Sequence, residues 1–385
     1  MASEGWSRLP RTAAALAGGI AEGLHLGAQL YVSLGGERIA DAAMGENRPG
    51  EPLTPDHLML WMSSTKPVAA VAICQLWERG RLELDDPVAR HLPAFAAHGK
   101  ERITLRHLLT HTAGIRLLDT GWPAAPWDEI VARIAAARPE PRWTPGEKAG
   151  YHLASSWFLL GEVVRRLDPA GRTFDHYARE EVFDPAGMAD AWVGLPPERY
   201  RAYAAAGRVG ALYATENPPP REQAWTSEAR LAAVNPGGGG CGPMRDLGRF
   251  YETLLGTAAG VRGQGPNGRL LSPQTVEAAT ARHRVGMLDH TFRHVMDWGL
   301  GFILDSKRYG VETVPYGYGR LASPRTFGHS GYRSSVAFGD PEHRLAVALA
   351  MNGTPAETAH ERRVRAVLDA IYEDLGLAPA APPAP

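Results

Sequence analysis

The sequence predicts an α+β fold in which one antiparallel sheet is built from the two ends of the chain and flanked by helices. Residues 28–45 alternate between apolar and polar side chains around Gly35-Gly36, which is typical of a β-hairpin. Three stretches near the other end have the pattern of antiparallel strands joined by turns: 298–304, 325–340 and 344–353. Because the residues between these groups are mostly helical in pattern, we predict a second, mostly helical domain.

We place a discontinuous sheet domain at residues 1–95 and 291–385 and the helical insertion at residues 96–290, with an active site in the cleft between them. The sheet domain would begin with a helix over residues 12–25 and end with one over residues 356–376. This division predicts that a site in the cleft takes residues from both domains.

Within the insertion, residues 103–115 predict a helix that ends at Gly114, and Tyr151-His152 would open another. The glycine-rich residues 235–242 lack the Lys-Ser/Thr of a phosphate-binding loop, so we interpret them as a tight turn. His111 has no partner at metal-ligand spacing and is assigned a structural role.

The composition argues against several classes of function. The chain has 41 basic and 42 acidic residues in 385, a formal net charge of -1, which favours neither nucleic acid nor an anionic membrane. No apolar run reaches the roughly 18 residues that a membrane-spanning helix needs. We expect a cytoplasmic protein with a small-molecule partner, no nucleic-acid or membrane partner and no cofactor; the oligomeric state is not indicated.

The chain offers neither a disulfide framework nor a metal site. Its two cysteines, Cys74 and Cys241, are expected in the interior, although Cys241 follows four glycines and could also line a site. His290 and His294 are four residues apart, but no glutamate follows the first histidine as it does in metalloproteases. We therefore predict no metal ligands.

The main chemical signal is Ser63-x-x-Lys66, at the start of an amphipathic helix that ends at Gly80. A serine three residues before a lysine shares a helix face with it, so the amine can act as a base for the hydroxyl or lower the pKa of a neighbouring base. The chain has four lysines, and of these Lys66 alone has a serine at this position. Ser64 is one residue out of register, so Ser63 is the predicted nucleophile.

Two later motifs stand in an order that gives the chain a family resemblance. Tyr151-His152-Leu153 and Gly328-His329-Ser330-Gly331 follow Ser63-x-x-Lys66, where serine β-lactamases have Tyr-x-Asn and Lys-Thr-Gly. The chain thus resembles the serine β-lactamase and penicillin-binding-protein superfamily, and most of all its class C-like branch with family VIII carboxylesterases and natural-product acyltransferases. The resemblance implies a β-lactamase/transpeptidase-like fold.

The resemblance also implies roles for individual residues. Ser63 would attack an acyl carbonyl, and Tyr151, its pKa lowered by Lys66, would take the serine proton and pass it to the leaving oxygen. Lys66 would stay charged or share that proton. The backbone N–H groups of Ser63 and Tyr332 would form the oxyanion hole. The substrate would contact a set of residues around them: His152, His329, Ser330 and Gly331.

Two departures from the family pattern indicate the substrate class. Leu153 replaces the asparagine that binds the amide side chain of β-lactams, and His329 replaces the lysine that binds their carboxylate. A histidine is mostly neutral at pH 7. We therefore predict a carboxylesterase that forms an acyl-enzyme with a neutral ester or thioester, with loops near 122–143 and 217–225 shaping its pocket.

Other functions remain open on the sequence. An acyltransferase of secondary metabolism would use the same acyl-serine, and a β-lactamase or D-Ala peptidase would use the same catalytic residues. A non-catalytic binding module is a further alternative, although Ser63, Lys66 and Tyr151 are all retained. An α/β-hydrolase is disfavoured, because Tyr332 stands where the Gly-x-Ser-x-Gly elbow would end and too few residues follow for the acid and histidine.

Overall fold

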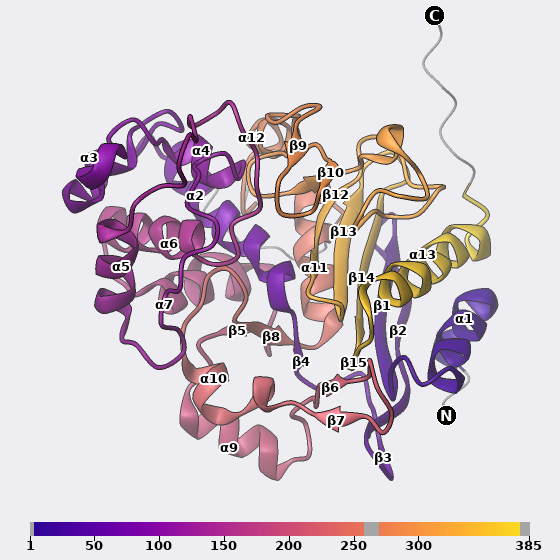
Figure 1. The fold of residues 1–385 in the computed structure, drawn as a ribbon. Coiled ribbons are helices and arrows are strands. Elements are labelled where there is room, and N and C mark those ends of the chain that lie inside the picture. Colours follow the sequence, from indigo (N-terminus) through magenta and orange to yellow (C-terminus); the bar gives the residue numbers. More distant parts are fainter. Residues whose placement is uncertain (1–3, 258–268, 378–385) are drawn as a thin grey trace, which may run out of the picture.

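The computed structural model describes residues 4–257 and 269–377, and its central feature is a seven-stranded antiparallel sheet (Figure 1). β1 and β14 come from opposite ends of the chain and pair in register, with Leu30 opposite Leu349. The predicted fold class is confirmed. In sheet order the strands are β11 (Ile303–Leu304), β12 (Phe327–Gly331), β13 (Ser335–Asp340), β14 (Leu345–Met351), β1 (Gly27–Leu34), β2 (Glu37–Arg48) and β3 (Glu51–Pro52).

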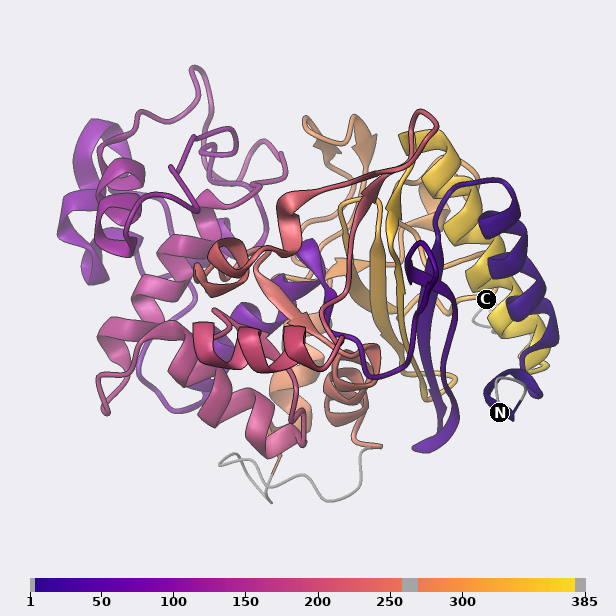
Figure 2. The same ribbon diagram turned by 90° about the horizontal axis from the view of Figure 1, so that it is seen from below.

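Helices cover both faces of this sheet because its strands alternate between two apolar clusters. In β1, Leu30 points to the face covered by α1 (Pro10–Ala21) and α13 (Glu357–Asp374), whereas Tyr31 points to the face covered by α11 (Met244–Leu255). α1 and α13 lie side by side at the outside of the molecule (Figures 1 and 2). The sheet face that α11 covers adjoins the helical region.

The helical region contains most of the remaining helices and shares one large core with the inner face of the sheet. Its longest helices are α2, which follows a 3₁₀ turn over Met62–Thr65, and α6. The helices are α2 (Lys66–Glu78), α3 (Val88–His91), α4 (Leu105–Leu109), α5 (Trp127–Ala136), α6 (Ser155–Leu167), α7 (Phe174–Ala178), α8 (Asp184–Ala186), α9 (Pro197–Ala205), α10 (Glu228–Ala232) and α12 (Pro273–Thr280).

Three small sheets connect these parts. One joins β4 (Met59–Leu60), β8 (Gly240–Gly242) and β5 (Trp192–Val193), so that the glycine-rich segment lies beside the strand that leads to Ser63. The others are β15 (Gly353–Thr354) with β6 (Tyr213–Ala214) and β7 (Arg221–Glu222), and β10 (His294–Val295) with β9 (Leu288–Asp289). The proposed division at residues 95/96 and 290/291 stays a prediction.

Two helix predictions in the insertion were wrong in their limits. The helix expected over 103–115 is limited to α4, because Thr104 caps its start and the backbone leaves the helical region before His111, whose φ is +58°. Tyr151 and His152 do not open a helix, since α6 begins at Ser155. Tyr151 instead lies in an irregular segment, and its backbone N–H donates a hydrogen bond to the Asp289 carboxylate (3.1 Å).

Candidate active site

Ser63 lies in a 3₁₀ turn that is confined from two sides. Met62, the residue before it, has a φ of +51°, a conformation that costs energy for a non-glycine residue and occurs often at functional sites. On one side the Trp61 N–H donates to Gly240 O (2.8 Å). On the other side Gly331 of β12 comes so close that a Cβ there would lie 2.4 Å from Trp61 O. The position of Ser63 therefore depends on both neighbours.

Lys66 is fully buried and its amine has three hydrogen-bond partners. Nζ lies 3.0 Å from Ser63 Oγ, 3.0 Å from Leu153 O and 2.6 Å from Gly237 O. Among the described residues no carboxylate pairs with it, and burial lowers its pKa well below the usual value for lysine. A neutral amine would donate to the two carbonyl oxygens and direct its lone pair to the Ser63 hydroxyl.

Ser64 faces away from this amine. Its side chain is fully buried, and its Oγ lies 3.1 Å from His329 O and 3.0 Å from Ser335 Oγ. Ser63, in contrast, is partly exposed and contacts Lys66. The geometry therefore favours the Ser63 register.

Tyr151 contacts both Ser63 and Lys66, but its pKa is raised and not lowered as expected. Its hydroxyl is hydrogen-bonded to Ser63, and Lys66 Nζ lies 4.9 Å from the centre of its ring. Burial raises the pKa of Tyr151, and the Ser63 hydrogen bond opposes this only in part. The expected lowering by Lys66 is wrong because a buried amine without a counter-ion does not keep the positive charge that would stabilise a phenolate. The ring packs among four others: His111, Phe292, Trp298 and His329.

The assignment of His152 to substrate contact was also wrong. His152 is fully buried, its Nε2 accepts the Ile115 N–H (3.1 Å), and its Nδ1 lies 3.1 Å from Nδ1 of His111. Since Nε2 accepts, the proton of the neutral ring is on Nδ1 and is donated to His111. Burial lowers the pKa of His152 to about 3, so this pair is an uncharged support behind Tyr151. His111 has the structural role that was expected of it.

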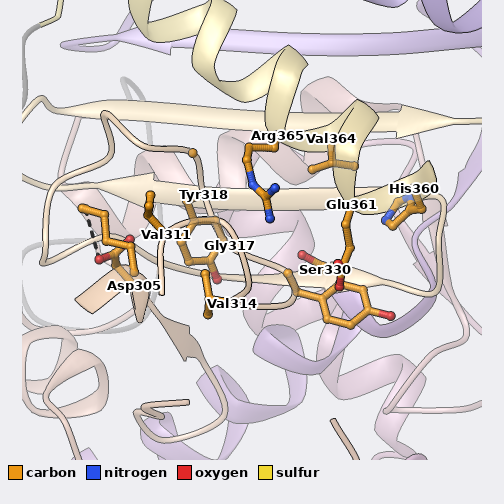
Figure 3. Close-up of a pocket in the computed structure, with 13 residues that line it drawn as sticks. Asp305, Val311, Val314, Gly317, Tyr318, Ser330, His360, Glu361, Val364 and Arg365 are labelled. Carbon is orange, nitrogen blue, oxygen red and sulfur yellow. Dashed lines mark hydrogen bonds and ion pairs between the residues drawn. The ribbon is translucent and has the colours of Figure 1, made fainter. Parts of the chain in front are cut away.

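The third motif occupies β12, where alternate side chains point in opposite directions. The His329 ring is buried near the Tyr151 and Trp298 rings, 6.0 and 5.7 Å between centres. Its Nδ1 contacts Ser330 O (2.8 Å), and burial lowers its pKa well below the usual value, so it is neutral. Ser330 points into a separate small cavity beside α13 (Figure 3). Gly331 has no side chain and contacts the Ser63 turn directly.

The two expected oxyanion donors lie at the ends of these elements. Neither the Ser63 N–H nor the Tyr332 N–H has a backbone acceptor in the part of the chain that the structure describes. Ser63 is in the first turn of its helix, where N–H groups have no intrahelical partner, and Tyr332 follows the last residue of β12. Both are thus available to a substrate oxygen, and their joint action stays a prediction.

Aromatic side chains border the site on the side of Tyr332. The Tyr332 ring is stacked on that of Trp225, with 6.3 Å between centres and 7° between planes. The Arg230 guanidinium lies over both Trp225 (5.0 Å) and Trp122 (5.3 Å). Leu153 is 57% exposed. Trp122 and Trp225 come from the two loops expected to shape the pocket, and that expectation stays a prediction.

Arg333, the residue after Tyr332, is already paired with acidic side chains. Arg333 Nε donates to Glu357 (2.8 Å), and its Nη1 pairs with Glu216 and donates to the Pro355 carbonyl (3.1 Å). Since Lys66 and His329 are held neutral, none of these three groups offers a free positive charge to a substrate carboxylate.

Sequence reasoning missed the support beneath Tyr151. Asp289 accepts hydrogen bonds from the backbone of Tyr151, Thr291 and Phe292, and it pairs with Arg284 (3.1 Å) where both side chains are fully buried. Gly237, which supplies a carbonyl to Lys66, was likewise not identified. A backbone acceptor has no residue-type signal, and Asp289 is far from Tyr151 in sequence, so neither could be found from a motif.

The chain also matches known proteins along most of its length. The model of the Beta-lactamase family matches residues 13–371. The chain belongs to this family. It is therefore a serine hydrolase of the β-lactamase superfamily, and the family contains both esterases and penicillin-binding proteins among the chain's relatives.

Three relatives illustrate this range. The esterase/beta-lactamase LipL of Mycobacterium tuberculosis is 27% identical over 361 residues, which cover 85% of this chain and 77% of LipL. The crystal structure of a penicillin-binding protein homologue from Caulobacter crescentus is 30% identical with a TM-score of 0.76, covering 95% of this chain and 97% of that one. A family VIII carboxylesterase structure is 27% identical with a TM-score of 0.78 and the same coverage.

Two other features of the described residues bear on function. None of their helices is both long enough and apolar enough to cross a membrane. They contain no group of three or more His, Cys, Asp or Glu residues placed to hold a metal ion.

Proposed function

We propose that this serine hydrolase is a carboxylesterase that acts on neutral esters. The observation that carries the proposal is the environment of Lys66, a buried amine with two carbonyl acceptors and the Ser63 hydroxyl as its partners. Such an amine is a base for Ser63 and not a binding site for an anion. His329 is neutral, and Arg333 is paired, so the site suits an uncharged acyl donor.

The reaction follows from these contacts. Ser63 Oγ attacks the ester carbonyl while its proton passes to Lys66, and the N–H groups of Ser63 and Tyr332 stabilise the developing oxyanion. The protonated amine then returns its proton to the leaving oxygen, with the Tyr151 hydroxyl as the relay. Because burial keeps Tyr151 protonated, it acts as a donor at this step and not as the initial base.

Acyl transfer to an alcohol or amine is the second candidate. It is favoured by the exposed apolar groups beside the nucleophile, Leu153 and Tyr332, which are 57% and 45% exposed. An apolar acceptor bound there would compete with water for the acyl-serine.

Intact-mass spectrometry tests both candidates. After mixing with p-nitrophenyl butyrate, we expect a transient butyryl adduct on Ser63 that water removes, and no adduct in Ser63→Ala. An alcohol acceptor that shortens the adduct lifetime and yields a new ester would establish transfer. Absence of any adduct and of ester turnover would refute the carboxylesterase proposal.

A further inference from the structure

A small cavity lies between β12, the segment 305–319 and α13, next to the active site (Figure 3). Its volume of about 20 Å³ is enough for one group of the size of a water molecule. Ser330 reaches it from β12, and Glu361 reaches it from α13. Two polar groups, one from the third motif and one from α13, therefore converge on one water-sized space.

The Ser330 hydroxyl has no hydrogen-bond partner in the part of the chain that the structure describes. The residue is 6% exposed, and across the described ranges its Oγ makes no hydrogen bond. Buried hydroxyls are nearly always hydrogen-bonded, and leaving one unpaired is unfavourable. The Ser330 hydroxyl is therefore free to donate or accept a hydrogen bond from a group bound in the cavity.

Burial and the neighbouring Glu357 raise the pKa of the lining carboxylate Glu361, and the positive charges of Arg365 and His294 oppose this in part. Among residues 4–257 and 269–377 Glu361 makes no side-chain hydrogen bond or ion pair. The other charges at the cavity cancel: Lys307 pairs with Asp305 (3.1 Å), and Arg365 pairs with Glu312 (3.2 Å). The neighbouring His360 is buried, with a pKa held well below its usual value, so it adds no charge.

This arrangement selects a small cation over an anion. A primary ammonium group is about as large as a water molecule, and its N–H donors suit the Ser330 oxygen and the Glu361 carboxylate. A carboxylate would meet the unpaired charge of Glu361, and both lining cations are already held by acidic partners. Attraction to Glu361 is strengthened because the carboxylate is only partly exposed.

The cavity adjoins the site on the side of Tyr151, to which two packed aromatic rings connect it. Tyr316, in its lining, packs on Phe292 (5.3 Å), and Phe292 packs on Tyr151 (4.8 Å). Ser330 directly precedes Gly331, which contacts the Ser63 turn. Since Tyr151 would relay the proton to the leaving oxygen, the alcohol part of an ester would lie toward this wall, opposite the Trp225–Tyr332 stack.

We propose that this cavity is a subsite for a primary ammonium group on the alcohol part of the ester, held by Glu361 and Ser330. The proposal rests on the carboxylesterase function and adds a substrate class to it, the amino-substituted esters. Glu361 and Ser330 would raise affinity for such substrates without taking part in bond making or breaking.

Matched ester pairs test the subsite. We would measure kcat/KM for 3- and 4-(aminomethyl)phenyl butyrate against 3- and 4-ethylphenyl butyrate, which differ by an ammonium in place of a methyl group. The amino ester of at least one pair should be preferred by about tenfold at low salt, and the preference should shrink as salt rises. Glu361→Gln should remove the preference and leave the ethylphenyl ester rates unchanged, and Ser330→Ala should reduce it. Glu373→Gln, at the far end of α13, is the matched control and should keep it.

The outcomes separate this proposal from the function on which it rests. Cleavage of the ethylphenyl esters without any preference for the amino esters overturns the subsite alone. A preference that survives in Glu361→Gln also overturns it, because the charge would then come from elsewhere. If no ester of either pair is cleaved, the carboxylesterase proposal fails and the subsite falls with it.

Discussion

At the scale of single residues, the protonation state of Lys66 determines how the nucleophile is activated. Its amine is enclosed by two backbone carbonyl oxygens and one hydroxyl, with no acidic partner among the described residues. Carbonyl oxygens accept hydrogen bonds from an amine in either state, but they do not compensate the full cost of burying its charge. We therefore expect Lys66 to act as the base and Tyr151 to keep its proton until the leaving group departs.

The first prediction concerns the pH profile. kcat/KM for p-nitrophenyl butyrate should rise with pH as Lys66 loses its proton, and this rise should lie well below the usual lysine pKa of about 10.4. Because burial raises the pKa of Tyr151, no further change should follow from its ionisation up to pH 10.

The variant Tyr151→Phe tests whether Lys66 or Tyr151 is the base that takes the Ser63 proton. The variant should lose about 10²-fold in kcat, as deletion of a proton-transfer group does, while the ascending limb stays in place. Loss of that limb in Tyr151→Phe would show that the phenol is the base after all. Lys66→Ala is the matched comparison, and it should abolish the limb.

The second prediction concerns the two adjacent serines. Ser63→Ala should abolish acylation, whereas Ser64→Ala should keep substantial activity. Ser64→Ala should instead lower the free energy of unfolding by about 1–2 kcal/mol, because its Oγ bonds to His329 O and Ser335 are lost. Urea unfolding and mass spectrometry of the acyl adduct would measure both effects. An acyl adduct on Ser64 in the wild-type protein would contradict the assignment.

At the scale of elements, the site depends on how closely β12 approaches the turn that carries Ser63. A Cβ at Gly331 would lie 2.3 Å from Ser335 Oγ, 2.4 Å from Trp61 O and 2.7 Å from Met62 Cβ. Two of these contacts are with backbone or a fixed Cβ, so the strand itself would have to move. The Tyr332 N–H follows this strand and would move with it.

Gly331→Ala is therefore the third prediction. It should reduce kcat by at least about 10²-fold through displacement of one oxyanion donor, with a smaller effect on KM. Gly18→Ala in α1 is the control, since a Cβ there meets nothing within 4 Å and it should be neutral or slightly stabilising. Steady-state kinetics of both variants with one ester would decide. Wild-type kcat in Gly331→Ala would show that β12 does not position the donor.

The fourth prediction concerns Asp246 in the first turn of α11. Burial raises its pKa to about 6, so the folded state holds a proton between about pH 4 and 6 that the unfolded state has lost. Stability should fall as pH rises through that window, and the cost should be fully present above it. Asp246→Asn should therefore add about 1–3 kcal/mol at pH 8 and almost nothing near pH 4.

Urea unfolding at the two pH values would measure this difference. The asparagine can still accept the Asp190 N–H that Asp246 accepts (2.9 Å), so that contact is kept. Asp128→Asn is the matched control, because Asp128 also lies in the first turn of a helix but its side chain is 91% exposed. A similar gain at both pH values would contradict the explanation from burial.

At the scale of the whole molecule, the proposed preference for neutral esters follows from the state of three basic groups described beside the nucleophile, Lys66, His329 and Arg333. Burial lowers the pKa of Lys66 and of His329 well below their usual values, and Arg333 is held by Glu216 and Glu357. A β-lactam carries a carboxylate that would find no partner among these groups. The fifth prediction is that p-nitrophenyl butyrate exceeds a chromogenic cephalosporin in kcat/KM by about 10²-fold or more. Equal kcat/KM values for the two substrates would contradict the argument that a substrate carboxylate finds no partner in this site.

The parts of this structure that the sequence could predict are those that depend on local pattern. The alternation in β1 and β14, the helical period of α13 and the Ser63-x-x-Lys66 spacing are each contained in short segments. The rest depends on burial by distant segments. The orientation of His152 is determined by Ile115 and His111, and the pKa values of Lys66 and Tyr151 by the surrounding core. A sequence motif predicts the catalytic side chains but does not show whether they are charged.

The pairing of β1 with β14 has a consequence for synthesis of the chain. Ser63 and Lys66 leave the ribosome early, but Ser64 Oγ bonds to Ser335, 271 residues later, and the Tyr332 N–H emerges just before it. Long-range strand pairing waits for its partner, so the nascent chain would hold a nucleophile without its oxyanion donor. Activity would appear in one step, when residues 327–351 become free to join the sheet, and the incomplete polypeptide would be protected from premature acylation.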